Sequence, residues 1–441
     1  MRLIERKLTS SQLIIIGFAA VILLGSLLLM LPAASRSGES APFLDVLFTA
    51  TSAVCVTGLV VCDTASSWSA FGHVVILLLI QVGGMGVVTA AAAVSMLSGR
   101  SIGLKQRSAM QEAISVSSMS GIVKTTGSIL RTMLILELLG ALALFPSMCA
   151  SFGAVKGIGY SLFHSVSAFC NAGFDLMGAH TSYASLTAYA ADPAVNIAIM
   201  ALIVTGGIGF ATWHDIGHHG WKIRKYRMQS KVILTTAGIL IMLPAAYFYF
   251  FEFASMPAGE RLLASFFQSV TTRTAGFNTA DLTAMSESGQ ALMILLMLIG
   301  GAPGSTAGGM KTTTFAVLLA AAAAVCRRRE HAHFYGRRVP EDTLRSAAAI
   351  LTMYLMLFFF GGMAISRLES IALLPALFET ASAIGTVGLT LGITPQLGGI
   401  SRAILIGLMF FGRVGALTLV YAAFPAGGGA QCYPQEKITV G

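Results

Sequence analysis

The sequence predicts an all-α polytopic membrane protein, with four repeats of outer helix, re-entrant pore loop and inner helix around a central pseudo-fourfold pore. Three observations lead to this fold class. Hydrophobic residues make up 55% of the 441 residues and charged residues only 11%, roughly half the charged fraction of soluble domains. Apolar runs such as 13–31 are long enough to cross a bilayer. Polar segments of one pattern recur between such runs.

The first apolar run, residues 13–31, follows a basic start, MRLIERK, and precedes the small residues PAAS. A cleaved signal peptide is one interpretation of this arrangement. The apolar core of a signal peptide usually spans about 7 to 15 residues. The longer run therefore favours a retained first outer helix.

The recurring polar segment begins with Phe, continues through small and hydroxyl residues, and reaches Gly ten positions after the Phe. Its four copies are FTATSAVCVTGL (48–59), FHSVSAFCNAGF (163–174), FFQSVTTRTAGF (266–277) and FETASAIGTVGL (378–389). The alternative, four surface turns with coincidental glycines, does not account for a match over the whole segment at near-constant spacing. The copies therefore mark four internal repeats.

Each polar segment lies between two apolar runs. The preceding runs, expected to be outer helices, are 13–31, 129–151, 232–253 and 346–366. The following runs, expected to be inner helices, are 72–97, 194–213, 290–326 and 402–424. The sequence thus predicts eight spanning helices in repeats at 1–115, 116–224, 225–340 and 341–441, the last with a short cytoplasmic tail.

The polar segments are too short to cross about 30 Å of hydrocarbon as helices. Irregular backbone is tolerated at that depth only against protein or a water-filled cavity. A short pore helix points its negative C-terminal dipole at the pore centre, glycine lets the chain turn back, and rings of carbonyls replace the hydration shell of a cation. The predicted filter residues are Val56, Thr57, Gly58, Asn171, Ala172, Gly173, Thr274, Ala275, Gly276, Thr386, Val387 and Gly388.

Charged and polar residues near these segments have less specific interpretations. Asp63, Asp175 and Asp281 follow filter glycines closely and would place negative charge at the outer mouth, although each could equally be a solvated loop acid. Arg273 lies within a filter segment, where we expect its guanidinium to brace backbone carbonyls, since a cation facing the pore would repel the ion. His164 is expected to open the second pore helix, with no catalytic partner.

The stretch GGAPGSTAGG (300–309) interrupts the third inner run with five glycines and a proline. These residues remove helix propensity and a backbone donor, so the inner helix is expected to break at 300–310. A loop beneath a filter would obstruct the pore and act as a gate; a static kink is the alternative. The predicted gate residues are Gly304, Ser305, Thr306, Ala307, Gly308, Lys311 and Arg413.

Arg413 belongs to this set because it lies within the last apolar run, between MFFG and VGAL. A charge at membrane depth is costly and normally has a functional or paired role. We expect Arg413 to lie midway along the last inner helix, to project toward the pore below the filter, and to act as an electrostatic barrier. Snorkelling and packing are the alternatives.

The net charge of +9 is distributed unevenly. Lys and Arg concentrate in the N-terminus and in segments 100–131, 222–231 and 327–345, whereas the other connections carry mostly Asp and Glu. This positive-inside pattern places both termini and the basic segments in the cytoplasm and argues against a nucleic-acid partner. The six cysteines have no metal-ligand spacing and are expected to be packing residues.

The four repeats, the single glycine per filter, GGAPGSTAGGMKTTT (300–314) and GRVGALTL (412–419) resemble the Ktr/Trk/HKT potassium transporter superfamily. The resemblance is greatest to the membrane subunit, KtrB, of bacterial KtrAB systems. It implies K⁺ uptake across a bacterial plasma membrane, K⁺ at the filter carbonyls, a homodimer and a cytosolic nucleotide-binding regulatory subunit, a KtrA-like ring. Na⁺ stimulation stays open. Ala416 departs from the family pattern, in which Pro is common at this position.

The polar segment 101–126 is long enough to contact such a partner, or to lie on anionic membrane lipid. Two other functional classes fit the sequence less well. A secondary active symporter coupled to Na⁺ or H⁺ would have inverted repeats and membrane-embedded acids, but these repeats run in parallel and Glu137 forms no relay. A membrane enzyme would need a converging nucleophile, base or metal set, and none is evident.

Overall fold

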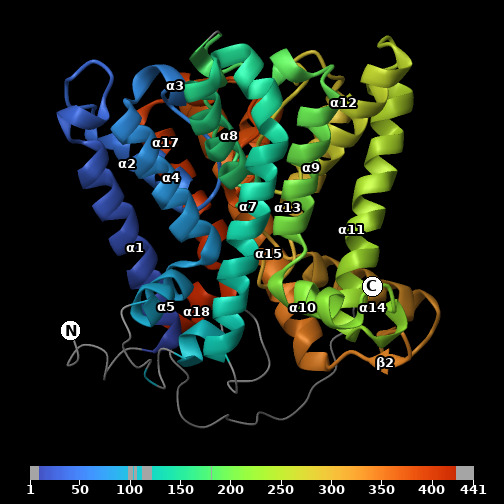
Figure 1. Ribbon diagram of the computed structural model, residues 1–441. Coiled ribbons are helices and arrows are strands. Elements are labelled where there is room, and N and C mark those ends of the chain that lie inside the picture. The colour runs from blue at the N-terminus through green and yellow to red at the C-terminus, as the bar shows by residue number, and fades with distance from the viewer. Residues whose placement is uncertain (1–8, 98–102, 104–106, 112–121, 180, 424–441) are drawn as a thin grey trace.

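The computed structural model describes residues 9–97, 103, 107–111, 122–179 and 181–423. The predicted tail from residue 424, and part of the segment 101–126, lie outside these residues. Four units of outer helix, pore helix and inner helix follow one another along the chain (Figure 1). The predicted all-α fold with four repeats is confirmed.

The outer helices are the long apolar elements. They are α1 (Ser10–Leu29), α7 (Ile122–Phe152), α11 (Met228–Tyr247), which a π-helical turn η5 (Phe248–Glu252) continues, and α15 (Glu341–Glu369). A capping box at Thr9 and Gln12 starts α1. Large apolar side chains such as Leu24, Leu142 and Phe360 are about 60% exposed or more, which suits a surface that faces lipid.

The pore helices are shorter and far more buried. They are α2 (Phe43–Val54), α8 (Ala154–Phe169), α12 (Ala258–Thr271) and α16 (Leu373–Gly385). Each ends inside one of the four polar segments, as predicted. Their last turns are buried almost without exception, and Phe48, Phe169, Phe267 and Phe378 are among the largest fully buried side chains. The core of the molecule therefore surrounds the ends of the pore helices.

The inner helices differ from the prediction. Three apolar runs form bent pairs: α4 (Ala70–Met85) with α5 (Val87–Leu97), α9 (Pro193–Gly207) with α10 (Phe210–His219), and α17 (Gly399–Val414) with α18 (Ala416–Ala423). The bends are 101°, 99° and 95°. Continuous helices at 72–97, 194–213 and 402–424 were wrong, because Gly86, Gly209 and Gly415 adopt positive φ at the breaks.

The third inner run divides into α13 (Glu287–Leu298) and α14 (Thr312–Cys326), with residues 299–311 as an irregular segment between them, which we call the loop. The predicted break is confirmed, but a break is common to all four repeats. By length and composition, the described residues contain four full-length spans, or up to seven if each bent pair is counted as one.

The second halves α5, α10, α14 and α18 lie together at the lower end of the molecule (Figure 1). This end also carries the basic segments 222–231 and 327–345, so we call it the basic end. The opposite, acidic end carries Glu39, Asp63 and Asp281. The first and last described helices, α1 and α18, meet at the basic end, where Gln12 Nε2 donates to Ala422 O at 3.3 Å. The asymmetry of charge along the sequence is thus an asymmetry between two ends of the molecule.

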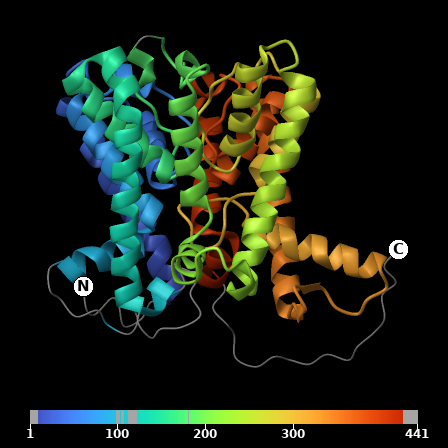
Figure 2. The same ribbon diagram turned by 45° about the vertical axis from the view of Figure 1, so that its right-hand side comes forward.

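Short elements complete the two ends. A hairpin of β1 (His333–Phe334) and β2 (Arg337–Arg338) connects α14 with α15 at the basic end and projects sideways with α14 (Figure 2). The remaining elements are α3 (Thr64–Ser67), η1 (Pro32–Ala34), η2 (Met177–Ala179), η3 (Thr187–Tyr189), η4 (Ile223–Lys225) and η6 (Thr394–Gln396).

Candidate ion pathway

The four predicted filter segments, which we call the filter segments after this prediction, share one backbone conformation. The residue two before each glycine has positive φ although it carries a side chain: Val56 (50°), Asn171 (57°), Thr274 (66°) and Thr386 (50°). The glycines follow with φ of 91°, 69°, 80° and 95° in chain order. Positive φ is uncommon outside glycine, so its recurrence at one position of every repeat shows that the four segments are built alike.

The four glycines form a closed ring. A Cβ atom added to Gly58 would lie 2.5 Å from the carbonyl oxygen of Ala172, in the second repeat. The same contact joins Gly173 to Ala275 O at 2.7 Å, Gly276 to Val387 O at 2.5 Å, and Gly388 to Thr57 O, which returns to the first repeat. Each repeat thus places the carbonyl before its glycine against the glycine of the preceding repeat.

Buried hydroxyl groups of the pore helices hold these segments. Ser52 Oγ accepts from Gly58 N at 3.0 Å, and Ser382 Oγ accepts from Gly388 N at 2.9 Å. In the second and third repeats the hydroxyls donate instead, Ser167 to Phe174 O at 2.7 Å and Thr271 to Phe277 O at 2.5 Å. The hydroxyl residues of the repeated pattern therefore satisfy backbone groups that flank the filter glycines.

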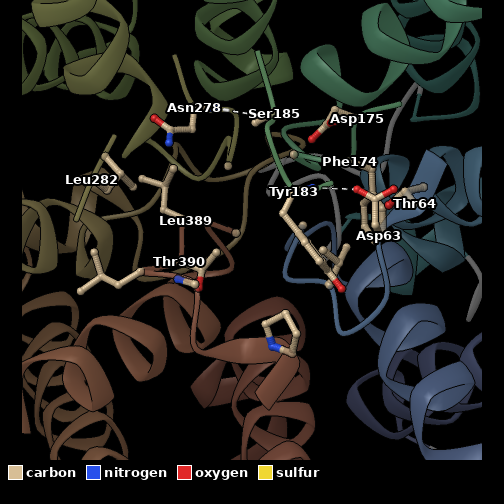
Figure 3. A pocket seen from close by; sticks show the side chains of 18 of the residues that line it. Asp63, Thr64, Phe174, Asp175, Tyr183, Ser185, Asn278, Leu282, Leu389 and Thr390 are labelled. Carbon is tan, nitrogen blue, oxygen red and sulfur yellow. Dashed lines mark hydrogen bonds between the residues drawn. The ribbon is translucent and has the colours of Figure 1, made fainter. Parts of the chain in front are cut away.

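A cavity of about 360 Å³ opens above the ring, toward the acidic end. All four filter glycines line it, together with Asp63, Asp175 and Asp281, and its walls come from every repeat (Figure 3). Asp175 lies in the connection between α8 and α9, where burial raises the pKa of its carboxyl group to about 6. Three acidic side chains, those of Asp63, Asp175 and Asp281, therefore lie in the cavity beside the ring.

Hydrogen bonds join the loop to the filter segments on the side of the ring that faces away from the first cavity. Thr306 Oγ1 donates to Phe169 O and to Asn171 Oδ1, both at 3.0 Å. Asn171 Nδ2 in turn donates to Arg273 O at 3.2 Å. Lys311 Nζ closes the loop on itself by donating to Ala307 O at 2.8 Å. Of the predicted gate residues, Thr306 therefore contacts the second filter segment, and Asn171 links that segment to the third.

Arg413 crosses from the last inner helix to the loop. Its guanidinium donates to Thr306 O in the loop and to Gly83 O and Gly84 O at the end of α4. The expected position midway along a continuous helix was wrong, because α17 ends at Val414, one residue after Arg413, where Gly415 breaks the run. The side chain thus joins three inner segments at the level of their breaks.

A second cavity, of about 340 Å³, lies on the far side of the loop. Its lining includes Ser305, Lys311 and Arg413 together with the break residues Gly86 and Gly415. Of the residues that the structure describes, none lines both cavities. The filter ring and the loop therefore stand between a cavity open to the acidic end and one among the inner-helix breaks.

Arg273 and His164 are buried side chains behind the ring whose roles were predicted from the sequence. Arg273 Nη2 donates to Gly300 O at 2.7 Å in a buried site, which confirms the predicted brace. His164 does not open its helix, since α8 begins at Ala154; it lies in the buried second half. Glu379, also buried, was missed. Its only sequence signal is that it occupies the same position as His164 in the pattern.

Among the described residues, no group of three or more His, Cys, Asp or Glu side chains is arranged to hold a metal ion. The polar groups of the pathway are backbone carbonyls, hydroxyls and single charged side chains.

The family model of TrkH, described as a cation transport protein, matches residues 5–427. The potassium/sodium uptake protein NtpJ of Enterococcus hirae is 39% identical, over 99% of this chain and 98% of that protein. The Ktr system potassium uptake protein B of Bacillus subtilis is 36% identical, over 99% of this chain and 97% of that protein.

The crystal structure of the potassium transporter TrkH from Vibrio parahaemolyticus superposes with a TM-score of 0.72, covering 93% of this chain and 85% of that one. At 19% identity this similarity supports the fold alone. The family match and the two full-length relatives establish more. The chain belongs to the TrkH family of cation transport proteins, which are transporters and not enzymes.

Proposed function

We propose that this protein mediates K⁺ uptake through the ring of four glycines. The closed order of contacts from Gly58 through Gly173 and Gly276 to Gly388 and back is the observation that carries the proposal. It brings four carbonyls around one axis, where they can replace the hydration shell of a cation. The names of the two relatives, which include potassium uptake, support K⁺ as the ion.

The carboxylates of the first cavity assist at the entrance. Asp63, Asp175 and Asp281 lie within the cavity that opens onto the ring, and grouped negative charge raises the local concentration of cations. Below the ring, the loop and Arg413 obstruct the path, since positive charge and a constriction both oppose passage of a cation. Opening of the pathway then requires displacement of the loop.

The orientation and partners follow from the two ends. The basic end faces the cytoplasm of a bacterium by the positive-inside rule, so ions enter from the acidic end. A cytosolic nucleotide-binding regulatory subunit would contact the basic end, where the first residues of α10 and α14 adjoin the loop, and the membrane protein would work as a homodimer. These parts of the proposal come from resemblance to Ktr systems.

The test is growth of a K⁺-uptake-deficient bacterium at low external K⁺, with the chain alone or with a cognate regulatory subunit. We expect growth to be restored, and isotope uptake to saturate with K⁺. Parallel assays with and without Na⁺ determine whether Na⁺ stimulates transport. Absence of rescue by a protein shown to be correctly inserted in the membrane would contradict the proposal.

A further inference from the structure

Two buried side chains occupy matching positions behind the ring. His164 in α8 and Glu379 in α16 each stand nine residues before the filter glycine of their repeat, Gly173 and Gly388. Neither side chain is accessible to solvent. Histidine and glutamate differ in shape, but both side chains can accept a hydrogen bond. Their contacts therefore show whether the two residues have the same structural role.

Both side chains accept a hydrogen bond from the same backbone group of their repeat. Leu176 N donates to His164 Nε2 at 3.2 Å, and Leu391 N donates to Glu379 Oε1 at 3.2 Å. Leu176 and Leu391 are each the third residue after the filter glycine. The pore helix and the chain that leaves the filter are therefore tied together by one equivalent bond in the second and fourth repeats.

The neighbouring contacts fix the acceptor role of His164. Its Nδ1 lies 2.7 Å from the carbonyl oxygen of Tyr160, which can only accept, so Nδ1 carries the ring proton. Nε2 is then unprotonated and takes the N–H of Leu176. This ring is a neutral acceptor held in one orientation.

Glu379 makes the larger set of contacts. Besides Leu391 N, its carboxyl group accepts from the hydroxyl of Thr390 and, at 2.7 Å, from the hydroxyl of Thr394. All three donors belong to the short stretch that follows Gly388. Several bonds to one buried carboxyl group reinforce each other in a low-dielectric interior, so Glu379 holds this stretch more firmly than a single bond would.

The first and third repeats have no such acceptor. Thr49 and Phe267 occupy the corresponding positions, and the Thr49 hydroxyl donates only to Asp45 O in its own helix, at 2.9 Å. The connection that follows α8 holds the chain after these two filters: Tyr183 donates to Val61 O at 3.0 Å, and Ser185 Oγ accepts from Asn278 N at 3.0 Å (Figure 3). In the third repeat the pore helix adds a bond of another kind, from Gln268 Nε2 to the side chain of Asn278 at 2.9 Å.

We infer that His164 and Glu379 are positioning residues that fix the second and fourth filter segments and thereby set the preference for K⁺ over Na⁺. The inference rests on the proposed function. Each filter glycine lies between the end of its pore helix and the residue that these side chains tie back. When the acceptor is removed, a buried N–H loses its partner, the tied stretch relaxes, and the spacing of the ring carbonyls changes.

The test compares Glu379→Ala and His164→Ala with Glu379→Gln and His164→Gln, since the amide oxygen of Gln can still accept the backbone N–H. Thr49→Val is the matched control at the same position of the first repeat. K⁺ uptake is measured against increasing Na⁺. We expect the alanine variants to lose about fivefold in K⁺ over Na⁺ selectivity, the glutamine variants to recover most of it, and Thr49→Val to match the wild type.

The result that overturns the inference is wild-type selectivity in both alanine variants when they are inserted in the membrane. An equal loss of selectivity in Thr49→Val also overturns it, because the effect would then be general damage to a pore helix. If the alanine variants fail to insert, Thr394→Val, which removes one donor to Glu379, must lower selectivity in the same direction. A wild-type protein without K⁺-selective uptake would instead contradict the proposed function.

Discussion

Each filter glycine faces a carbonyl of the next repeat, so the absence of a side chain is a requirement of the ring. Gly388 has a φ of 95°. Among the four ring glycines, the distance between an added Cβ atom and the facing carbonyl oxygen is shortest at Gly388, where that oxygen belongs to Thr57. We expect Gly388→Ser to weaken K⁺ discrimination over Na⁺ or to raise the apparent KM for K⁺. A rise of about tenfold corresponds to about 1.4 kcal/mol of lost coordination free energy.

The control for this substitution is Gly407→Ser, because Gly407 lies in α17 of the same repeat and an added Cβ there meets no atom within 4 Å. Its uptake in mixed K⁺ and Na⁺ should equal that of the wild type. If all four filter Gly→Ser variants keep wild-type selectivity and affinity, the ring is not the filter.

Arg413 combines a positive charge with contacts that hold the loop. Its guanidinium donates to Thr306 O and to the carbonyls at the end of α4. We expect Arg413→Ala to raise the maximal uptake rate several-fold, because both the charge in the path and the bond to the loop are lost. Initial-rate uptake at saturating K⁺ measures this.

Arg413→Lys is the matched variant, since lysine keeps the charge but has no planar fork of donors to reach several carbonyls at once. A rate between those of the wild type and the alanine variant is expected. Wild-type transport with reduced thermal stability in Arg413→Ala would assign this residue to packing alone.

At the scale of elements, the loop, which is the break of the third inner helix, is joined to the breaks of the other three. Ala302 N donates to Gly207 O at 2.9 Å and Phe210 N donates to Gly304 O at 2.8 Å, which joins the loop to the break between α9 and α10. Gly309 N donates to Gly412 O at 3.2 Å, near the end of α17. Arg413 completes the set by reaching α4. The obstruction is thus a layer to which every repeat contributes.

Deletion of residues 304–307 tests this layer as a gate. The deletion removes Thr306 and the contacts of Arg413 and Phe210 with the loop, so we expect a membrane-inserted protein with markedly higher K⁺ flux and less dependence on a regulatory subunit. Because Thr306 also bonds to the second filter segment, some loss of K⁺ selectivity should accompany the gain.

Thr306→Val is the mild counterpart of this deletion. It removes the hydroxyl bonds to Phe169 O and Asn171 but keeps the length of the loop, so a smaller rise in flux is expected. Abolished or unchanged flux in a properly inserted deletion variant would contradict the gate and favour a static kink.

The charge asymmetry of the whole molecule predicts its orientation in the membrane. Cys326 is exposed at the end of α14, contrary to the expectation that the cysteines are packing residues. A membrane-impermeant maleimide should label Cys326 only after the membrane is opened. A cysteine introduced by Ser37→Cys, in the exposed connection between α1 and α2, should be labelled in intact cells. Cys326→Ser is the control, and labelling of Cys326 in intact cells would reverse the orientation.

The sequence by itself determined the number of repeats, the positions of the four ring glycines, the break at 300–310 and the separation of basic from acidic connections. The physical reason is that each depends on residue type. A span needs apolar length, a turn with positive φ needs glycine or tolerates few other residues, and Pro with Gly ends a helix wherever it is placed. These features can therefore be predicted from residue type alone.

Only the tertiary structure decided where the inner helices bend and which carbonyls the buried side chains reach. A single glycine such as Gly86 or Gly415 is compatible with a continuous apolar helix, so the bend depends on what packs around it. Every residue has a carbonyl, so no pattern could assign Arg413 to Thr306, nor could it pair His164 with Leu176. The packing of four repeats around one axis brings Arg413 to Thr306, which are 107 residues apart along the chain. His164 meets Leu176 within one repeat because the chain turns back at Gly173 and passes the pore helix that it has just left.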